Sequence, residues 1–162
     1  NAWGYMVDRF RGSNLGTDEF ASILERASDF HGHMGPFLVI GLRAGLVGLR
    51  ELKRRKGDVN LCATVSLDYS IPYSCILDGI QLATGCTIGN KRLRFGDSPD
   101  LKISFEDSSG GTADVSIVQQ VIDGLRREIA KNNSSEKVEG LAYKVVSMAE
   151  DELFVIDKRQ ET

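Results

Sequence analysis

Both histidines of the chain, His31 and His33, lie one residue apart in the segment Phe30-His31-Gly32-His33-Met34-Gly35-Pro36. Imidazole is the commonest metal ligand in proteins, and it titrates closer to neutral pH than any other ordinary side chain. The glycine between the histidines allows the loop either to bring both rings to one point or to splay them apart. The spacing therefore fits a metal or catalytic site. It equally fits a loop in which one ring caps the following helix and the other lies in solvent.

A second group of reactive side chains falls on a helix that the sequence predicts over 72–84. Cys75, Asp78 and Gln81 are three residues apart, so a thiol, a carboxylate and an amide share one side of this helix, opposite an apolar face. Cys75 would lie in the first turn, where the helix dipole is expected to lower the pKa of its thiol. Such a polar face is more than packing in a core requires.

These side chains allow two kinds of chemistry. A thiolate and two imidazoles suit zinc or another borderline divalent metal, with His31, His33 and Cys75 as ligands. The same residues allow covalent catalysis, with Cys75 as nucleophile, either histidine as base and Asp78 as the orienting carboxylate. Both mechanisms need the histidine loop and the start of the helix to meet in space, so spacing alone does not separate them.

The remaining cysteines, Cys62 and Cys86, are interpreted as structural residues. Cys62 lies on the more polar face of a predicted strand, and Cys86 follows the glycine that ends the predicted helix. Three cysteines cannot all pair, and none forms a CxxC motif, which is more typical of a reducing compartment than of a disulfide-bonded protein. We therefore expect a cytoplasmic protein.

Length and charge limit the classes of partner. The chain has 162 residues, enough for one domain with its own core, and 20 basic against 23 acidic residues give a formal charge of -3. This balance gives no reason to expect binding to nucleic acid or to a membrane surface. The longest apolar run, 36–42, ends at Arg43 and is far shorter than the roughly 20 residues of a membrane span.

The elements that must position the reactive residues follow from the hydrophobic periodicity. Helices are expected over 17–29, 36–56, 72–84 and 118–131 and from 135 onward, and strands over 61–68, 92–95, 101–106, 113–117 and 153–156. The segment 1–16 has no periodicity and is interpreted as an arm, in which Asn1-Ala2 resembles the remnant of a removed tag. Residues 17–162 are expected to form a single α+β domain, in which several helices pack on a small, mostly antiparallel sheet.

Two further features belong to the predicted helix over 36–56. Gly41, Gly45 and Gly48 fall on one stripe, which predicts close approach by another element, and this stripe and the arm are the expected dimer surface. The basic run Lys53–Lys56 ends the helix. It is interpreted as complementing the helix dipole, with an anion site as the alternative.

Two segments together resemble a known family. The histidine loop is similar to the HGHxCPG-type loop, and 74–89, which reads SCILDGIQLATGCTIG, is similar to the SCxxDxIQxxTGCTxG helix and loop, of the formylmethanofuran dehydrogenase FmdE family. The likeness is good over about 20–105 and looser beyond. Where many relatives have cysteine after HGHx this chain has Gly35, so a site that uses that thiol is incomplete here. His31, His33 and Cys75 are the candidates that are left.

The resemblance implies an α+β core, often dimeric, with a metal near the histidine loop and the helix cysteine. It also implies association with the molybdenum or tungsten enzyme that fixes carbon dioxide onto methanofuran, although three scattered cysteines are too few for an iron–sulfur cluster. We therefore expect a homodimer that binds a divalent metal, zinc above all, through His31, His33 and Cys75, with Asp78 or Gln81 supporting a ligand or contacting a substrate.

Two alternatives stay open beside the metal-binding hypothesis. One is a metal-independent enzyme with Cys75 as nucleophile and a histidine as base, and the other is a purely structural subunit. The sequence identifies neither a substrate nor a reaction.

Overall fold

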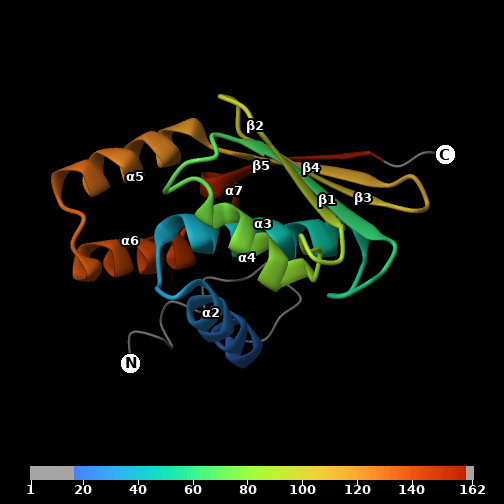
Figure 1. The fold of residues 1–162 in the computed structure, drawn as a ribbon, viewed down its shortest axis with the longest axis horizontal. Helices are drawn as coiled ribbons and strands as arrows, with labels where there is room; N and C mark the ends of the chain where they lie inside the picture. Colours follow the sequence, from blue (N-terminus) through green and yellow to red (C-terminus); the bar gives the residue numbers. More distant parts are fainter. Residues whose placement is uncertain (1–16, 160–162) are drawn as a thin grey trace.

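The computed structural model describes residues 17–159, which form six helices and one five-stranded sheet (Figure 1). The helices are α2 (Thr17–His31), α3 (Pro36–Leu52), α4 (Cys75–Thr84), α5 (Gln119–Lys131), α6 (Ser135–Ser147) and α7 (Glu150–Leu153). The strands are β1 (Leu61–Leu67), β2 (Leu93–Asp97), β3 (Lys102–Asp107), β4 (Thr112–Ile117) and β5 (Phe154–Arg159). The predicted arm, 1–16, lies outside the described residues.

The sheet is mixed and mostly antiparallel, as predicted. Its strand order is β2-β1-β3-β4-β5, and the pair β1–β2 is parallel whereas the other three pairs are antiparallel. Along β1, Leu61, Ala63, Val65 and Leu67 are buried, while Thr64 on the opposite face is exposed. This alternation is the mark of a sheet that packs helices on one face only. The predicted α+β class is confirmed.

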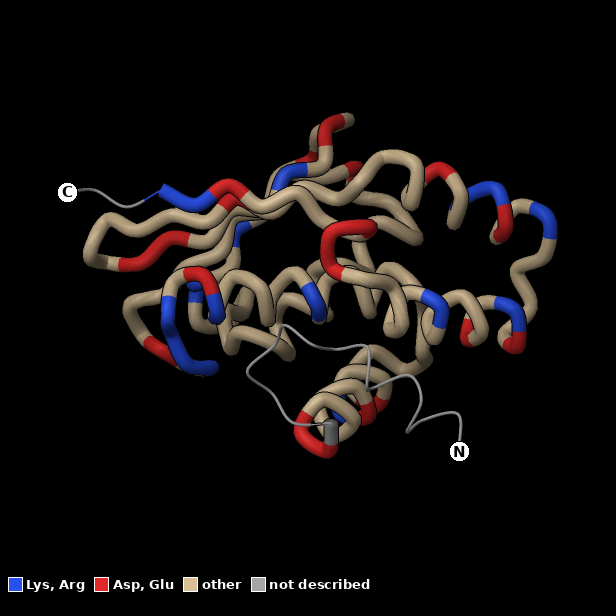
Figure 2. Tube along the Cα trace, turned by 180° about the vertical axis from the view of Figure 1, so that it is seen from behind, with Lys and Arg blue, Asp and Glu red and all other residues tan. Residues whose placement is uncertain are grey.

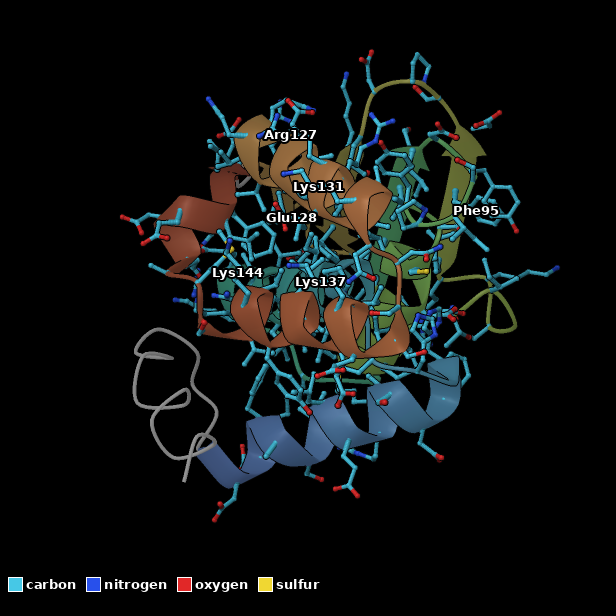
Figure 3. All side chains as sticks on the ribbon, turned by 90° about the vertical axis from the view of Figure 1, so that its left-hand side faces the viewer. Phe95, Arg127, Glu128, Lys131, Lys137 and Lys144 are labelled. Carbon is cyan, nitrogen blue, oxygen red and sulfur yellow. The ribbon has the colours of Figure 1, made fainter. Side chains whose placement is uncertain are left out.

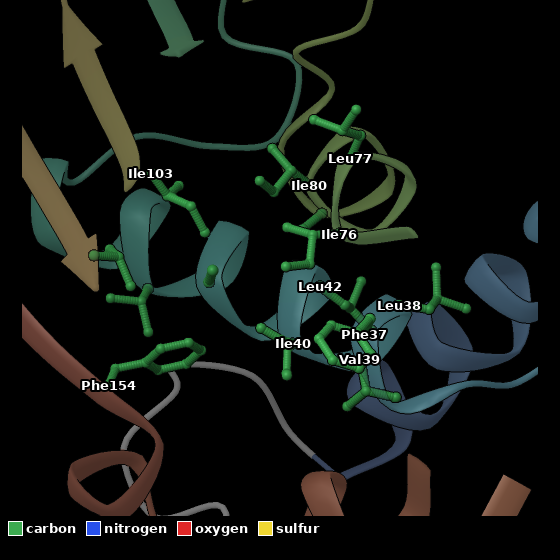
Figure 4. Close-up of a cluster of buried hydrophobic side chains, with 14 of the residues drawn as sticks. Phe37, Leu38, Val39, Ile40, Leu42, Ile76, Leu77, Ile80, Ile103 and Phe154 are labelled. Carbon is green, nitrogen blue, oxygen red and sulfur yellow. The ribbon is translucent and has the colours of Figure 1, made fainter. Parts of the chain in front are cut away.

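Helix α3 is the centre of the core. Every residue from Pro36 to Gly45 is buried, which explains why this stretch is apolar nearly all round. Figure 1 shows α3 running beneath the sheet, with α4 beside it and α2 on the far side from the strands. In Figure 4, Leu42 of α3 lies next to Ile76 of α4. Because the first ten residues of α3 are covered on all sides, they hold the attached histidine segment in a fixed position.

The glycine stripe lets α3 and α4 touch backbone to backbone. A Cβ on Gly41 would collide with the carbonyl oxygen of Ile76, and one on Gly79 would collide with the backbone of α3. Gly45 faces Ala83, and Gly48 faces the ring of Phe105. The predicted close approach is confirmed. The prediction of the stripe as a dimer surface was wrong, because α4 and β3 of the same chain already fill it.

Two helix boundaries differ from the prediction by three residues or more. Helix α3 ends at Leu52, since Lys53 adopts a left-handed conformation with φ 53° and the N–H groups of Lys53 and Arg54 cap the last turn. Four consecutive like charges would repel one another if the helix continued. Helix α4 begins at Cys75, because the chain forms a turn over 71–74, in which the Ile71–Pro72 peptide bond is cis.

The remaining helices complete the scaffold on the side away from β2. Arg43 of α3 is 6% exposed and donates from Nη1 to the carbonyl oxygens of Val145 and Met148, which anchors the end of α6. Figure 3 shows α5 and α6 stacked above α2, with Glu128 and Lys137 between them. Nζ of Lys137 lies 3.0 Å from Oε2 of Glu128. Among residues 17–159, none of the helices has the length and apolar character needed to cross a membrane.

Candidate functional site

The histidine segment and α4 do meet in space, through His31 and Asp78. His31 is the last residue of α2, not a loop residue as predicted, and its Nδ1 lies 2.6 Å from Oδ2 of Asp78 on α4. The His31 side chain is 13% exposed and that of Asp78 is 34% exposed. A contact this short between partly buried groups fixes the orientation of the imidazole ring.

The second carboxylate oxygen of Asp78 is also hydrogen-bonded. Its Oδ1 accepts a hydrogen bond from Nε2 of Gln81 at 3.2 Å, and Oε1 of Gln81 accepts from the backbone N–H of Ile88 at 3.1 Å. Gln81 thereby links the carboxylate to the loop that follows α4. Two residues of the predicted polar face, Asp78 and Gln81, thus form a chain of hydrogen bonds that ends on His31.

His33 lies beside His31, so the loop brings the two rings together. Their centroids are 4.7 Å apart and their planes are tilted by 40°. Gly32 between them has φ 99°, the left-handed region that glycine adopts without strain, so this residue allows the tight turn. Partial burial and the neighbouring His31 lower the pKa of His33, which keeps its ring neutral and available as a ligand or base.

Cys75 opens α4 one turn before Asp78 and is half-buried. The sequence predicts a lowered thiol pKa at this helix start, and that prediction was wrong. Burial, with the Asp78 carboxylate as the second cause, raises the pKa of Cys75. The desolvation and repulsion felt by the thiolate outweigh the helix dipole, which is worth about 0.3–1 kcal/mol at exposed positions.

His31 shows the feature expected of a metal ligand. Its Nε2 is buried and has no hydrogen-bond partner among residues 17–159, while its Nδ1 is held by Asp78. Metal-binding histidines typically use one ring nitrogen for the metal and the other for a carboxylate. Within the described part of the chain, however, no three His, Cys, Asp or Glu side chains are grouped as a metal site requires. The donor atoms of the histidine pair therefore fit a metal, and a third protein ligand is not in place.

Gly35 is one reason why the histidine pair lacks a third protein ligand. It has extended backbone angles, φ -133° and ψ 159°, and a Cβ built on it would lie 3.2 Å from Nε2 of His33. A side chain at this position would therefore point at the second histidine. The absence of a thiol here, noted in the sequence, removes a donor from the immediate surroundings of the histidine pair.

A pocket of about 370 Å³ lies beside His33, between the end of α2 and the start of α6. Its lining mixes the apolar side chains of Met34 and Val138 with the hydroxyls of Ser28 and Ser135 and one carboxylate, that of Glu139. No pattern in the sequence indicates it, because its walls come from segments about a hundred residues apart. Cys86 is fully buried and donates from Sγ to the carbonyl oxygen of Leu61, as expected for a structural cysteine.

Known proteins of two kinds, one curated sequence and one solved structure, illustrate what this chain is similar to. Over 75 residues the chain is 35% identical to an Archaeoglobus fulgidus protein named "Probable S-adenosyl-L-methionine-binding protein", which corresponds to 46% of this chain and 20% of that protein. The chain thus spans about a fifth of the length of this curated relative. A solved Syntrophus aciditrophicus structure, a tungsten formylmethanofuran dehydrogenase FmdE-like protein, matches 88% of this chain and 73% of that chain. Its TM-score is 0.58 at 19% identity, which shows a shared fold.

The family is shown by a match over most of the sequence. The family model described as "FmdE, Molybdenum formylmethanofuran dehydrogenase operon" matches residues 30–155. The matched region begins at the histidine segment and includes α4 with Asp78 and Gln81. Because it spans well over half of the chain, the protein belongs to the FmdE family.

Proposed function

We propose that this FmdE-family protein binds a divalent metal ion, zinc by ligand type, through Nε2 of His31 and the ring of His33. The observation that carries the proposal is the buried Nε2 of His31, which has no partner although Asp78 holds the other nitrogen of the same ring at 2.6 Å. A buried polar atom without a partner costs about 1–3 kcal/mol, so a fold that retains one gains from a ligand at that point.

Cys75 is the proposed third ligand. It lies on the same side of α4 as Asp78, and its raised pKa means that the thiol keeps its proton at neutral pH unless a metal displaces it. Proton release on metal binding is therefore an expected signature. Since no three-residue group is in place in residues 17–159, we expect Cys75 to contribute less to affinity than the histidine pair.

A bound divalent ion would act as a Lewis acid toward a ligand in its open positions. Residues of the chain itself would orient the metal ligands and contact the bound molecule. Asp78 orients His31, Gln81 holds Asp78, and the pocket beside His33 offers the polar side chains of Ser28, Ser135 and Glu139 to a small molecule. The family match and the shared fold support association with other components of a molybdenum or tungsten formylmethanofuran dehydrogenase.

The test is elemental analysis of protein purified without a chelator or a histidine tag. We expect near-stoichiometric metal in the parent protein, loss of most of it in His31→Ala and His33→Ala, and partial loss in Cys75→Ser. Cys62→Ser is the matched control, because Cys62 is also half-buried and lies on β1, away from the histidine segment. Metal-free parent protein, or equal loss in Cys62→Ser, would contradict the proposal.

The cysteine-nucleophile alternative gains no support from these surroundings. A nucleophilic thiol needs a lowered pKa or an adjacent base, whereas burial and Asp78 raise the pKa of Cys75. The alternative of a purely structural role makes a different prediction, namely that alanine at both histidines leaves assembly with partner proteins and any activity of the complex unchanged.

A further inference from the structure

A second pocket, of about 830 Å³, lies at the opposite end of α3 from the histidine segment. Its floor is apolar, formed by Ile23 of α2, Leu46 and Leu49 of α3 and Ala83 of α4. Its rim is basic and includes the run Lys53–Lys56, which is visible in Figure 2 as the continuous blue stretch of tube where α3 ends. A volume of this size is typical of small-molecule sites, which combine an apolar lining with a few placed charges.

The basic rim is not neutralised by the protein. Two of its arginines are paired: Arg50 with Glu150 at 2.5 Å, and Arg54 with Asp58 at 3.3 Å. In contrast, Lys53, Arg55 and Lys56 form no ion pair with any carboxylate of residues 17–159. Glu19 is the single acid among the described lining residues. With three unpaired cations and one carboxylate, the described lining carries a net excess of about two positive charges above an apolar floor.

The helix dipole does not account for this excess. The C-terminus of a helix carries the equivalent of about half a negative charge, and its last carbonyl groups here already accept hydrogen bonds from the backbone N–H groups of Lys53 and Arg54. One cation would balance that charge. In addition, desolvation and the nearby Arg26 lower the pKa of Lys56, so the protein itself disfavours the charge that it places there.

We propose that this pocket binds a small amphipathic anion, with a phosphate or carboxylate group held by Lys53, Arg55 and Lys56 and an apolar body lying on Ile23 and Leu49. A ligand that has both an anionic group and an apolar body would use the basic rim and the apolar floor together. The inference is independent of the proposed metal site, because it uses none of the residues around His31 and Asp78.

The test is isothermal titration of the full chain with four probes: 1-naphthyl phosphate, 1-naphthoate, inorganic phosphate and 1-naphthol. We expect at least one of the two naphthyl anions to bind tenfold or more tightly than either inorganic phosphate or 1-naphthol, because only these probes meet rim and floor together. The tighter of the two naphthyl anions assigns the anionic group. No saturable binding, or naphthyl anions that bind no better than inorganic phosphate, would overturn the proposal.

Matched variants locate the site. Arg55→Gln and Lys56→Gln should each weaken binding of the tighter naphthyl anion about three- to fivefold, the range of a single exposed charge contact. Lys102→Gln makes the same charge change at an exposed residue of β3 and should leave binding of this anion unchanged. Glu19→Gln should strengthen binding, a gain that a damaged fold could not produce. If Lys102→Gln weakens binding as much as Lys56→Gln, the anion is responding to net charge alone and the pocket assignment fails.

Discussion

At the scale of single residues, Asp78 is the side chain on which the candidate metal site depends. It fixes one nitrogen of His31 and leaves the other buried without a partner. Carboxylates that orient a metal-binding histidine typically contribute 10- to 100-fold in affinity. We expect Asp78→Asn to weaken zinc binding by that factor while the fold persists, measured by competition with a chromogenic chelator.

Gln119→Glu is the control for that change, because it also exchanges an amide and a carboxylate, on exposed α5 and away from the site. It should leave zinc affinity unaltered. Unchanged affinity in Asp78→Asn would mean that the His31–Asp78 contact serves only stability.

Gly35 allows a gain-of-function test. Its extended backbone accepts any residue, and its Cβ would lie 3.2 Å from Nε2 of His33, so the neighbouring ring must shift by only a few tenths of an ångström. Gly35→Cys would place a thiol beside the histidine pair. We expect zinc affinity to rise tenfold or more, measured by the same competition. Gly35→Ser should give a much smaller gain, because a hydroxyl is a poorer zinc ligand.

The reactivity of Cys75 reports its raised pKa. Burial and the Asp78 carboxylate both disfavour the thiolate, so in metal-free protein the alkylation rate should be low at neutral pH and should keep rising above the pH at which ordinary thiols reach their plateau. Asp78→Asn should move the midpoint of this rise to lower pH, but only partly, since burial is the larger cause. Mass spectrometry of the Cys75 peptide measures both, and fast alkylation at pH 7 would support the nucleophile alternative.

At the scale of elements, the contact between α3 and α4 determines where Cys75, Asp78 and Gln81 lie. Gly41→Ala and Gly79→Ala would each push a methyl group into the backbone of the facing helix. We expect each change to destabilise the protein by about 3 kcal/mol, the upper range for overpacking, measured by urea denaturation. Gly140→Ala on α6 meets nothing within 4 Å and should stabilise it by about 0.5–1 kcal/mol. Equal effects at all three positions would contradict this account of the stripe.

Features that depend on neighbouring residues could be predicted from the sequence, whereas features that depend on contacts between distant segments could not. β1 was predicted to within one residue of its observed bounds, 61–67, because alternation is a local signal, and Gly85 was correctly predicted to end α4 because a left-handed cap selects glycine. The polar face of α4 was also visible in the spacing of its residues. Asp78 was also predicted to orient a histidine, but the sequence does not show that this histidine is His31, or that burial raises the pKa of Cys75. Both depend on packing between segments far apart in the chain.

At the scale of the whole molecule, metal binding should couple to stability, since a ligand that binds only the folded state stabilises it by mass action. Zinc at 100 times its dissociation constant contributes about 2.7 kcal/mol, which for a chain of this size raises the melting temperature by roughly 5–10 °C. Differential scanning calorimetry of the parent protein should show this shift. It should be absent in His31→Ala and His33→Ala, and its presence in those variants would place the zinc elsewhere.

The two candidate sites should act independently, because α3 holds them apart. The helix has 17 residues, so its ends lie about 25 Å apart at 1.5 Å per residue, and charge interactions are largely screened beyond about 8–10 Å at physiological salt. Its buried, glycine-packed middle is held on all sides and offers no second arrangement through which one end could influence the other. The zinc dissociation constant, measured with and without saturating 1-naphthyl phosphate, should therefore agree within twofold. A larger change would mean that α3 shifts as a unit and transmits coupling between the histidine pair and the basic rim.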